Sequence, residues 1–448
     1  MKGQTFLRKM LLVSLNGLYM GAIGALPVAL GFWAYIPWQR LPYPPVYFVY
    51  SSILLFGSDL LVLIALGADL GLRALTRTPE VRWPHPSLLF LIGLAAWATL
   101  SAAWSLEPRL SFYTGLHLLG ISSLALSLSG RPSAWRPLSF GCFLGILLQT
   151  TLAALETIAQ STAFLKPLGL EWPGQLDPSI PGAAVIALPG GQRWLRAYGT
   201  LPHPNLLGLY LLGLAAAPAA WGLREDRWAI VGRVGIGLAA LGLGMSFSRA
   251  AWLGFGVGLL WLLAAPRVPT GRRMALALIG AGGLLTVACA FAPQTMIRIA
   301  GGGSPLEARS ILERRWLMEQ ALRQIRAHPL LGTGAGTFPL VLREVLPPGY
   351  RPEPVHYVGA LIMAELGLPG ALLGLGMAGA FLRSIHRGAS PEAWALAASL
   401  LGLLIVRMLD HPLWTLAPAR ALGGCLLGAW AGQLQANGEP ALTFSLQH

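Results

Sequence analysis

Long runs of apolar residues dominate the chain, and shorter polar segments separate them. A helix needs about 20 predominantly apolar residues to cross a bilayer. Runs of that length predict twelve transmembrane helices, at about residues 11–35, 47–70, 86–104, 111–129, 137–160, 203–222, 228–245, 249–265, 274–292, 356–382, 392–409 and 413–433. The predicted fold class is therefore all-α, a polytopic membrane protein in which residues 1–448 form a single transmembrane domain.

Basic residues are distributed unequally between the two sides that these spans define. Short cytoplasmic loops of membrane proteins are enriched in lysine and arginine. Half of the 32 basic residues fall in the N-terminal tail or beside short loops on one side: Lys2, Arg8, Lys9, Arg73, Arg77, Arg82, Arg131, Arg136, Arg224, Arg227, Arg233, Arg267, Arg272, Arg273, Arg383 and Arg387. The short loops of the other side carry few. We therefore expect both termini to be cytoplasmic.

Two loops on the predicted extracytoplasmic side are long, residues 161–202 and residues 293–355. They contain Lys166, Arg193, Arg196, Arg298, Arg309, Arg314, Arg315, Arg323, Arg326, Arg343 and Arg351. Long translocated loops are exempt from the charge rule, so these cations need another explanation, and anion binding is the obvious one. The second loop also predicts an amphipathic helix that begins at Ser304-Pro305, with apolar residues recurring at helical spacing from Ala308 to Ile325. Such a helix could equally lie on the membrane surface.

Composition supports the same class. Hydrophobic residues make up 55% of the chain and charged residues only 11%, whereas soluble domains have about 25% charged residues. The net charge of +14 would raise nucleic-acid binding in a soluble protein, but no basic run interleaved with aromatic residues is present, so no nucleic-acid partner is expected. The three cysteines fall inside apolar runs, far apart, and indicate no disulfide or metal site.

The scarcity of carboxylates narrows the chemistry. The chain has five aspartates and no Asp-x-Asp motif. It also has no phosphate-binding Gly-Lys-Ser/Thr loop, no Gly-x-Ser-x-Gly elbow and no zinc-ligand spacing. Any catalysis is therefore expected to need no metal and no cofactor, to use cations to hold a phosphate-bearing donor, and to take place outside the cytoplasm.

Four stretches at the predicted extracytoplasmic face contain the candidate residues. The first, Arg196-Ala-Tyr-Gly-Thr-Leu-Pro-His203-Pro204-Asn205, leads into a span that Asn205 can cap. The second, Ser246-Phe-Ser-Arg249, places an arginine that either snorkels to the interface or binds substrate. The third is the cluster of Arg309, Arg314 and Arg315, since guanidinium groups bind oxyanions bidentately.

The fourth is His356, the titratable group best placed for proton transfer at this face, although a histidine at a helix end is also a common interface residue. Glu365 lies nine residues further on, which turns it away from His356 around a helix. Glu365 is therefore expected to be a packing or lipid-path residue and not the partner of the histidine.

The order of these motifs resembles the O-antigen ligase and O-antigen polymerase superfamily of bacterial membrane proteins. The resemblance covers about residues 196–370 and includes Arg196 to Asn205, Ser246-Phe-Ser-Arg249-Ala-Ala-Trp-Leu-Gly, Arg314 ahead of Ala327-His-Pro-Leu-Leu-Gly-Thr-Gly-Ala-Gly-Thr-Phe338, and His356 ahead of Ala364-Glu-Leu-Gly-Leu-Pro-Gly370. Two features depart from the family pattern. Tyr357 stands where an asparagine often follows the histidine. In the family a tryptophan usually stands four residues after the loop arginine, but this spacing does not choose among Arg309, Arg314 and Arg315 here.

The resemblance implies a glycosyltransferase of the bacterial inner membrane that takes a glycan from undecaprenyl pyrophosphate and joins it to an acceptor sugar hydroxyl with inversion. It implies that His356, Arg249 and Arg314 are catalytic. Arg196, His203, Asn205, Arg309 and Arg315 are the candidates for binding the pyrophosphate or the glycan. The implied partners are the lipid-linked glycan donor, membrane lipid, and lipid A-core or another glycan or protein as acceptor.

Several functions remain open from the sequence. A polymerase or a protein O-oligosaccharyltransferase of the same superfamily differs from a ligase only in its acceptor. A lipid-linked glycan transporter or flippase also suits twelve spans, but it should show internal repeats and charged residues around a midplane cavity. The polar residues here gather instead in two loops. A membrane scaffold without activity gives no reason for that concentration of basic residues.

Overall fold

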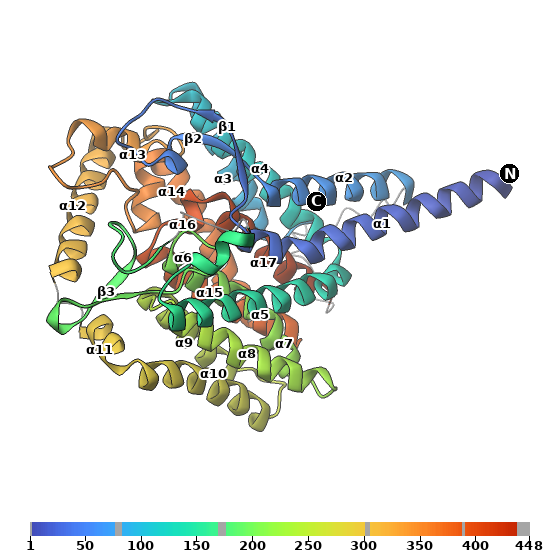
Figure 1. Cartoon of the computed structure of the whole chain (residues 1–448). Helices are drawn as coiled ribbons and strands as arrows, with labels where there is room; N and C mark the ends of the chain where they lie inside the picture. Colours follow the sequence, from blue (N-terminus) through green and yellow to red (C-terminus); the bar gives the residue numbers. More distant parts are fainter. Residues whose placement is uncertain (1, 77–82, 169–175, 301–304, 388–389, 437–448) are drawn as a thin grey trace.

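The computed structural model describes residues 2–76, 83–168, 176–300, 305–387 and 390–436, so the predicted residues Arg77, Arg82 and Ser304 lie outside the description. The described chain is a bundle of helices with two short β-hairpins (Figure 1). The helices are α1 (Lys2–Gly31), α2 (Gly57–Thr76), α3 (Pro86–Leu100), α4 (Pro108–Ser129), α5 (Trp135–Ala159), α6 (Pro204–Leu214), α7 (Ala216–Gly222), α8 (Trp228–Met245), α9 (Arg249–Leu263), α10 (Thr270–Ala290), α11 (Ala292–Ala300), α12 (Pro305–Ala327), α13 (Phe338–Val341), α14 (Val358–Ser384), α15 (Pro391–Leu409), α16 (Pro412–Thr415) and α17 (Ala417–Ala436).

Nine helical segments of the described chain are long and apolar enough to cross a membrane, which confirms a polytopic helical membrane protein. They are Phe6–Gly31, Pro86–Ala103, Pro108–Ser129, Pro132–Ala159, Pro204–Gly222, Trp228–Met245, Thr270–Ala290, Val358–Arg387 and Pro391–Leu409. The other three predicted spans coincide with α2, α9 and α17, and α9 has only 15 residues. The total of twelve therefore stays a prediction.

Small residues let the helices approach closely. The α9 and α15 backbones meet at Gly254 and Gly402, where a Cβ on Gly254 would lie 2.6 Å from the carbonyl oxygen of Gly402. Between α1 and α5, a Cβ on Gly141 would lie 2.0 Å from the carbonyl oxygen of Gly24. Packing of small residues is the usual means of helix association in a bilayer, where lipid offers no hydrophobic driving force between helices.

A short polar contact lies at each end of the bundle. At the end that carries the described residues of the two long loops (161–168, 176–202, 293–300 and 305–355), called here the long-loop end, Tyr43 Oη donates to Glu107 Oε2 at 2.5 Å. At the opposite end, Arg131 Nε donates to Asp69 Oδ1 at 2.5 Å. In Figure 1 the N-terminus of α1 lies on the far side of the bundle from α12. The order in which the loops alternate between the two ends, and the assignment of one end to the cytoplasm, remain predictions.

Two hairpins were not expected from the sequence. Strands β1 (Tyr35–Arg40) and β2 (Ser52–Phe56) pair antiparallel, as do β3 (Val185–Ala187) and β4 (Arg193–Leu195) within the first long loop. The predicted boundary of the second span at residue 47 was therefore wrong, because α2 begins only at Gly57. The Asp59 carboxylate accepts the Phe56 backbone N–H at 2.9 Å and so supports the start of this helix.

The predicted amphipathic helix of the second long loop is α12. Its buried face contains Leu317 and Ala321, which pack against α14. Ile311, Leu312 and Leu322, which the periodicity placed on the apolar face, are exposed. The helix therefore lies where the sequence predicted it, and contact with α14 selects the face that the bundle buries.

Candidate functional site

A cavity of about 190 Å³ opens at the long-loop end, between the starts of α6 and α9, the helices α11 and α12, and the segment that precedes α14. Six of the eight residues selected from the sequence line this cavity. They are Arg196, His203, Asn205, Arg249, Arg314 and His356. The remaining lining residues are Arg298, Ser310, Glu313, Leu317, Tyr350, Arg351 and Glu353.

The other two selected residues lie outside the cavity lining. The Arg315 side chain is 79% exposed and forms a salt bridge with Glu319 at 3.3 Å. Arg309 pairs with Glu313 at 2.8 Å and donates to the Gly349 carbonyl oxygen. Of the three arginines that the sequence could not separate, the geometry therefore favours Arg314 as the one that meets a ligand in the cavity.

The turn between α8 and α9 holds two of the cavity arginines through its backbone carbonyls. Arg196 Nε donates to the Ser246 oxygen at 2.9 Å, and Arg298 Nε donates to the Phe247 oxygen at 3.1 Å. Phe247 adopts a positive φ of 48°, which turns the chain sharply before α9. The Ser-Phe-Ser-Arg stretch thus orients Arg196 and Arg298 in addition to supplying Arg249.

Arg249 is hydrogen-bonded to the backbone of Arg298 and so belongs to the same group of arginines. It is the first residue of α9, and one of its terminal nitrogens donates to the Arg298 carbonyl oxygen at 3.3 Å. Fixed guanidinium groups that converge on one cavity form a site for an oxyanion, because they are pre-oriented and stay protonated.

The stretch from Arg196 to Asn205 is fixed to the bundle by α5. The buried Glu156 carboxylate accepts the backbone N–H groups of Tyr198 and Gly199 at 2.7 and 2.8 Å. Gln149 Oε1 accepts the Thr200 N–H at 3.0 Å. Gly199 has a φ of 60°, and a Cβ there would lie 2.1 Å from Gln149 Oε1. Only glycine fits this position without a rearrangement.

Glu365 likewise fixes a segment to the bundle, the glycine-rich loop that follows α12. Its carboxylate accepts the N–H groups of Gly336 at 2.8 Å and Phe338 at 3.2 Å, and the Trp414 indole N–H at 2.7 Å. The expectation that Glu365 packs the fold and does not partner His356 is confirmed. At Gly367 the backbone of α14 leaves helical geometry with a φ of 63°, where the Leu330 carbonyl approaches. The segment Ala327–Phe338, which follows Arg314, therefore packs directly against the segment Ala364–Gly370, which follows His356.

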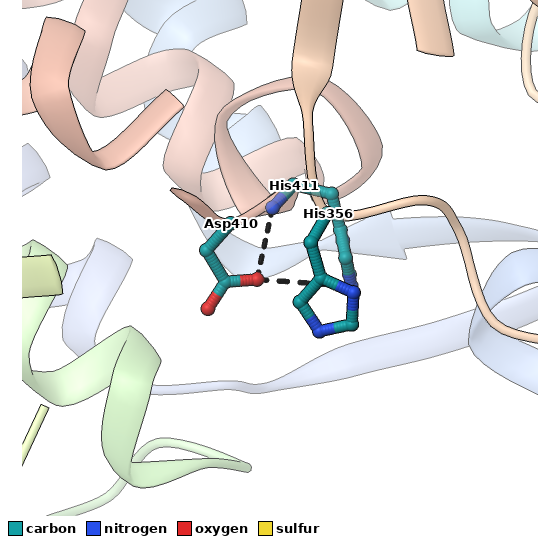
Figure 2. Close-up of side chains that lie close together, drawn as sticks. All are labelled: His356, Asp410 and His411. Atoms are coloured by element: carbon teal, nitrogen blue, oxygen red, sulfur yellow. Dashed lines mark hydrogen bonds and ion pairs between the residues drawn. The ribbon is translucent and has the colours of Figure 1, made fainter. Parts of the chain in front are cut away.

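His356 lies with Asp410 and His411 in one cluster (Figure 2). The ligand atoms of the three side chains all lie within 4.8 Å of one another, and the two imidazole rings meet edge to face with centroids 5.4 Å apart. His356 comes from the segment before α14, whereas Asp410 and His411 join α15 to α16. No residue of the described ranges hydrogen-bonds to the His356 ring, and its buried Nδ1 is left without a partner.

Asn205 connects this cluster to the arginines. Its side-chain oxygen accepts from a terminal nitrogen of Arg196 at 2.7 Å, and its Nδ2 donates to Asp410 Oδ2 at 2.9 Å. The expectation that Asn205 caps the following helix was wrong. The cap is His203, whose Nδ1 accepts the Asn205 backbone N–H at 3.1 Å. Because His203 caps the helix, the Asn205 side chain is left available for the network.

Burial controls the protonation of the cluster. It lowers the pKa of His356 to about 3, against the opposing effect of the Asp410 carboxylate. Burial by itself raises the pKa of Asp410, but His356, His411 and Arg314 outweigh it and bring this pKa to about 2. At neutral pH the cluster therefore contains an ionised carboxylate beside a neutral imidazole, which is the form that can accept a proton.

The three ligand types of this cluster, two imidazoles and one carboxylate, are also those of many metal sites. The positive charge of Arg314 opposes a divalent cation here, because it acts electrostatically on all three groups. The arrangement is better suited to proton transfer.

Sequence reasoning missed Asp410, His411, Arg298 and Arg351. Asp410-His411 was available as a signal, since this pair is polar, follows an apolar span and falls on the same predicted side as His356. Arg298 and Arg351 were counted among the basic residues of the long loop, but nothing in their spacing separated them from Arg323 or the other arginines there.

Fold and site together define an integral membrane protein with a cation-lined cavity and a histidine–carboxylate cluster at one end of its helical bundle. Residues 234–375 match the family model described as O-antigen ligase. The match confirms the predicted resemblance to this superfamily and supports glycosyltransferase activity of the ligase or polymerase type in general. It contains Arg249, Arg314 and His356, whereas Arg196 and Asp410 lie outside it. No curated protein matches the chain.

Proposed function

We propose that the protein transfers a glycan from undecaprenyl pyrophosphate to a hydroxyl group of an acceptor sugar at the extracytoplasmic face of the bacterial inner membrane. One observation carries this proposal. Arginines from both long loops and from the start of α9 line a single cavity that also contains His356. In that cavity a leaving oxyanion and a proton acceptor would be close to the same reacting carbon.

The arginines stabilise the leaving group. When the bond between the anomeric carbon and the pyrophosphate oxygen breaks, its electron pair goes to the pyrophosphate, which gains negative charge. Arg196, Arg249 and Arg298 are held by backbone carbonyls, so their charges are in place before the reaction. Stabilisation by such fixed groups needs little reorganisation in the transition state. It also supplies the charge that a metal ion would otherwise supply, so we propose that the reaction requires no metal.

His356 activates the nucleophile by accepting its proton. The acceptor hydroxyl oxygen forms the new bond to the anomeric carbon, and its proton passes to the neutral imidazole. Direct attack opposite the leaving pyrophosphate inverts the configuration at that carbon. Asp410 acts as a positioning residue that faces the imidazole and stabilises the imidazolium as it forms.

The ligase, polymerase and protein O-oligosaccharyltransferase alternatives share this donor chemistry and differ in the acceptor. A transporter is less well supported, because the charged groups that line the cavity gather at one end of the bundle. Turnover by the purified protein would separate an enzyme of any of these kinds from a flippase.

The test uses purified protein in detergent with an undecaprenyl-pyrophosphate-linked glycan and a cell-envelope acceptor fraction, and it measures release of undecaprenyl pyrophosphate. We expect release in the presence of a metal chelator and its loss in His356→Ala. His386→Ala is a matched control, because His386 is exposed and lies after α14 at the opposite end of the bundle. Normal release by His356→Ala would refute the role of the histidine, and inhibition by the chelator would refute the metal-free mechanism.

A further inference from the structure

Glu353 is a carboxylate in a cavity otherwise suited to anions. It lines the cavity together with Arg314, Arg351 and His356, and it lies three residues before His356. Its side chain is partly buried, and Arg351 and Arg314 act on it electrostatically, but no residue of the described ranges forms a hydrogen bond or salt bridge with its carboxylate. A carboxylate that no guanidinium group engages in a salt bridge would repel a pyrophosphate, so this part of the cavity is expected to receive a different part of the ligand.

The local chain holds Glu353 in a fixed direction. Pro352 and Pro354 flank it and are both buried, and Val355 behind them is fully buried in the core beside α14. Proline restricts its own backbone and that of the residue before it, so the segment is extended and stiff. The position of the carboxylate is therefore set by the fold and not by a partner side chain.

The second carboxylate of the cavity, unlike Glu353, is held by a partner side chain. Glu313, on α12, is already engaged by Arg309 Nε at 2.8 Å. Tyr350 also lines the cavity, and its ring is held edge to face by Trp316 with centroids 5.4 Å apart. This part of the lining thus presents one available hydrogen-bond acceptor and one fixed aromatic side chain. The cationic wall, formed by Arg196, Arg249 and Arg298, presents guanidinium groups instead.

We propose that Glu353 and Tyr350 form a sugar subsite, in which the Glu353 carboxylate accepts hydrogen bonds from hydroxyl groups of the acceptor sugar next to the hydroxyl that His356 deprotonates. Carboxylate oxygens accept hydrogen bonds from O–H or N–H groups, which a sugar supplies. A sugar ring also offers apolar C–H faces to an aromatic side chain. This inference rests on the proposed function and names the residues that would hold its acceptor sugar.

The test measures binding of two ligands separately. Methyl glucoside and methyl N-acetylglucosaminide serve as sugar probes, observed by saturation-transfer NMR, and inorganic pyrophosphate serves as the probe for the cationic wall. We expect Glu353→Gln and Glu353→Ala to weaken glycoside binding by about tenfold or more, since one hydrogen bond to a charged group is lost. Pyrophosphate binding should be unchanged or tighter, because a negative charge has been removed from the cavity. Glu319→Gln is the matched control, because Glu319 pairs with the exposed Arg315 outside the cavity lining, and it should leave both affinities within about twofold.

Equal glycoside binding by wild type and Glu353→Ala would overturn the subsite, as would the absence of glycoside binding to wild type. Parallel loss of pyrophosphate binding in Glu353→Gln would also overturn it, because a purely structural role would affect both ligands. The proposed function fails separately. It fails if wild type neither binds pyrophosphate nor releases the lipid carrier, whatever the glycosides do.

Discussion

Replacement of Asp410 by asparagine is the sharpest test of the cluster. The two side chains have the same shape, but asparagine carries no charge and places an N–H₂ group where one carboxylate oxygen was. In the protein, Asp410 accepts from Asn205 Nδ2 at 2.9 Å and from the His411 backbone N–H at 2.9 Å. The introduced asparagine can retain only one of these bonds. Its N–H₂ group would face either the Asn205 amide or the His411 N–H, and both are donors.

The structure gives the size of the effect. Loss of a buried hydrogen bond to a charged group costs about 1.5–3 kcal/mol. The carboxylate also faces His356 with ligand atoms within 4.8 Å, so at an effective dielectric constant of about 20 it stabilises the forming imidazolium by about 3 kcal/mol. We therefore expect Asp410→Asn to lower kcat/KM for release of the lipid carrier by at least about 100-fold, and to lower the melting temperature.

An exchange variant separates the two contributions. When Asn205→Asp and Asp410→Asn are combined, the carboxylate introduced at position 205 would accept from Arg196 and from the amide introduced at position 410. The oxygen of that amide would accept from the His411 backbone N–H. All donors are again paired, but the charge has moved away from His356. We expect the melting temperature to return to near that of wild type and kcat/KM to recover by about tenfold, but not completely.

Asp59→Asn is the control for loss of a partly buried carboxylate that contacts a histidine. Asp59 bonds His117 at 3.0 Å and lies outside the cavity, so its replacement should affect stability and not turnover. The reasoning is refuted if Asp410→Asn keeps the kcat/KM of wild type, or if the exchange variant is no more stable than Asp410→Asn alone.

Three further outcomes are expected. Because burial lowers the pKa of His356 to about 3, kcat/KM should show no acid limb near pH 6.5 and should stay flat down to about pH 5, and a limb near 6.5 in the pH profile would contradict this. Arg314→Ala should weaken pyrophosphate binding by about tenfold or more, whereas Arg315→Ala, at a side chain 79% exposed, should change it less than about twofold, as measured by calorimetry. Gly367→Ala should lower stability by at least about 2 kcal/mol in thermal unfolding, since its Cβ would lie 2.2 Å from the Leu330 carbonyl oxygen at a φ of 63°. Gly21→Ala, with open space around it, should not.

The sequence by itself determined the class of the molecule. A bilayer demands long apolar helices, so each span leaves a continuous hydrophobic signature that needs no tertiary information. The same reading found the two long loops, the amphipathic helix and six residues that line the cavity, because cations and a histidine stand out against an apolar background.

Only the tertiary structure decided which polar residues meet. Asp410 and Asn205 are far apart in sequence, and nothing local to either indicates the bond between them. Arg314 and Arg315 are neighbours with the same chemistry, and contact of α12 with α14 turns one into the cavity and leaves the other exposed. The physical reason is the same in both cases. Apolar pattern is a local property of the chain, whereas the direction in which a side chain points is fixed by packing against segments that the chain reaches only after folding.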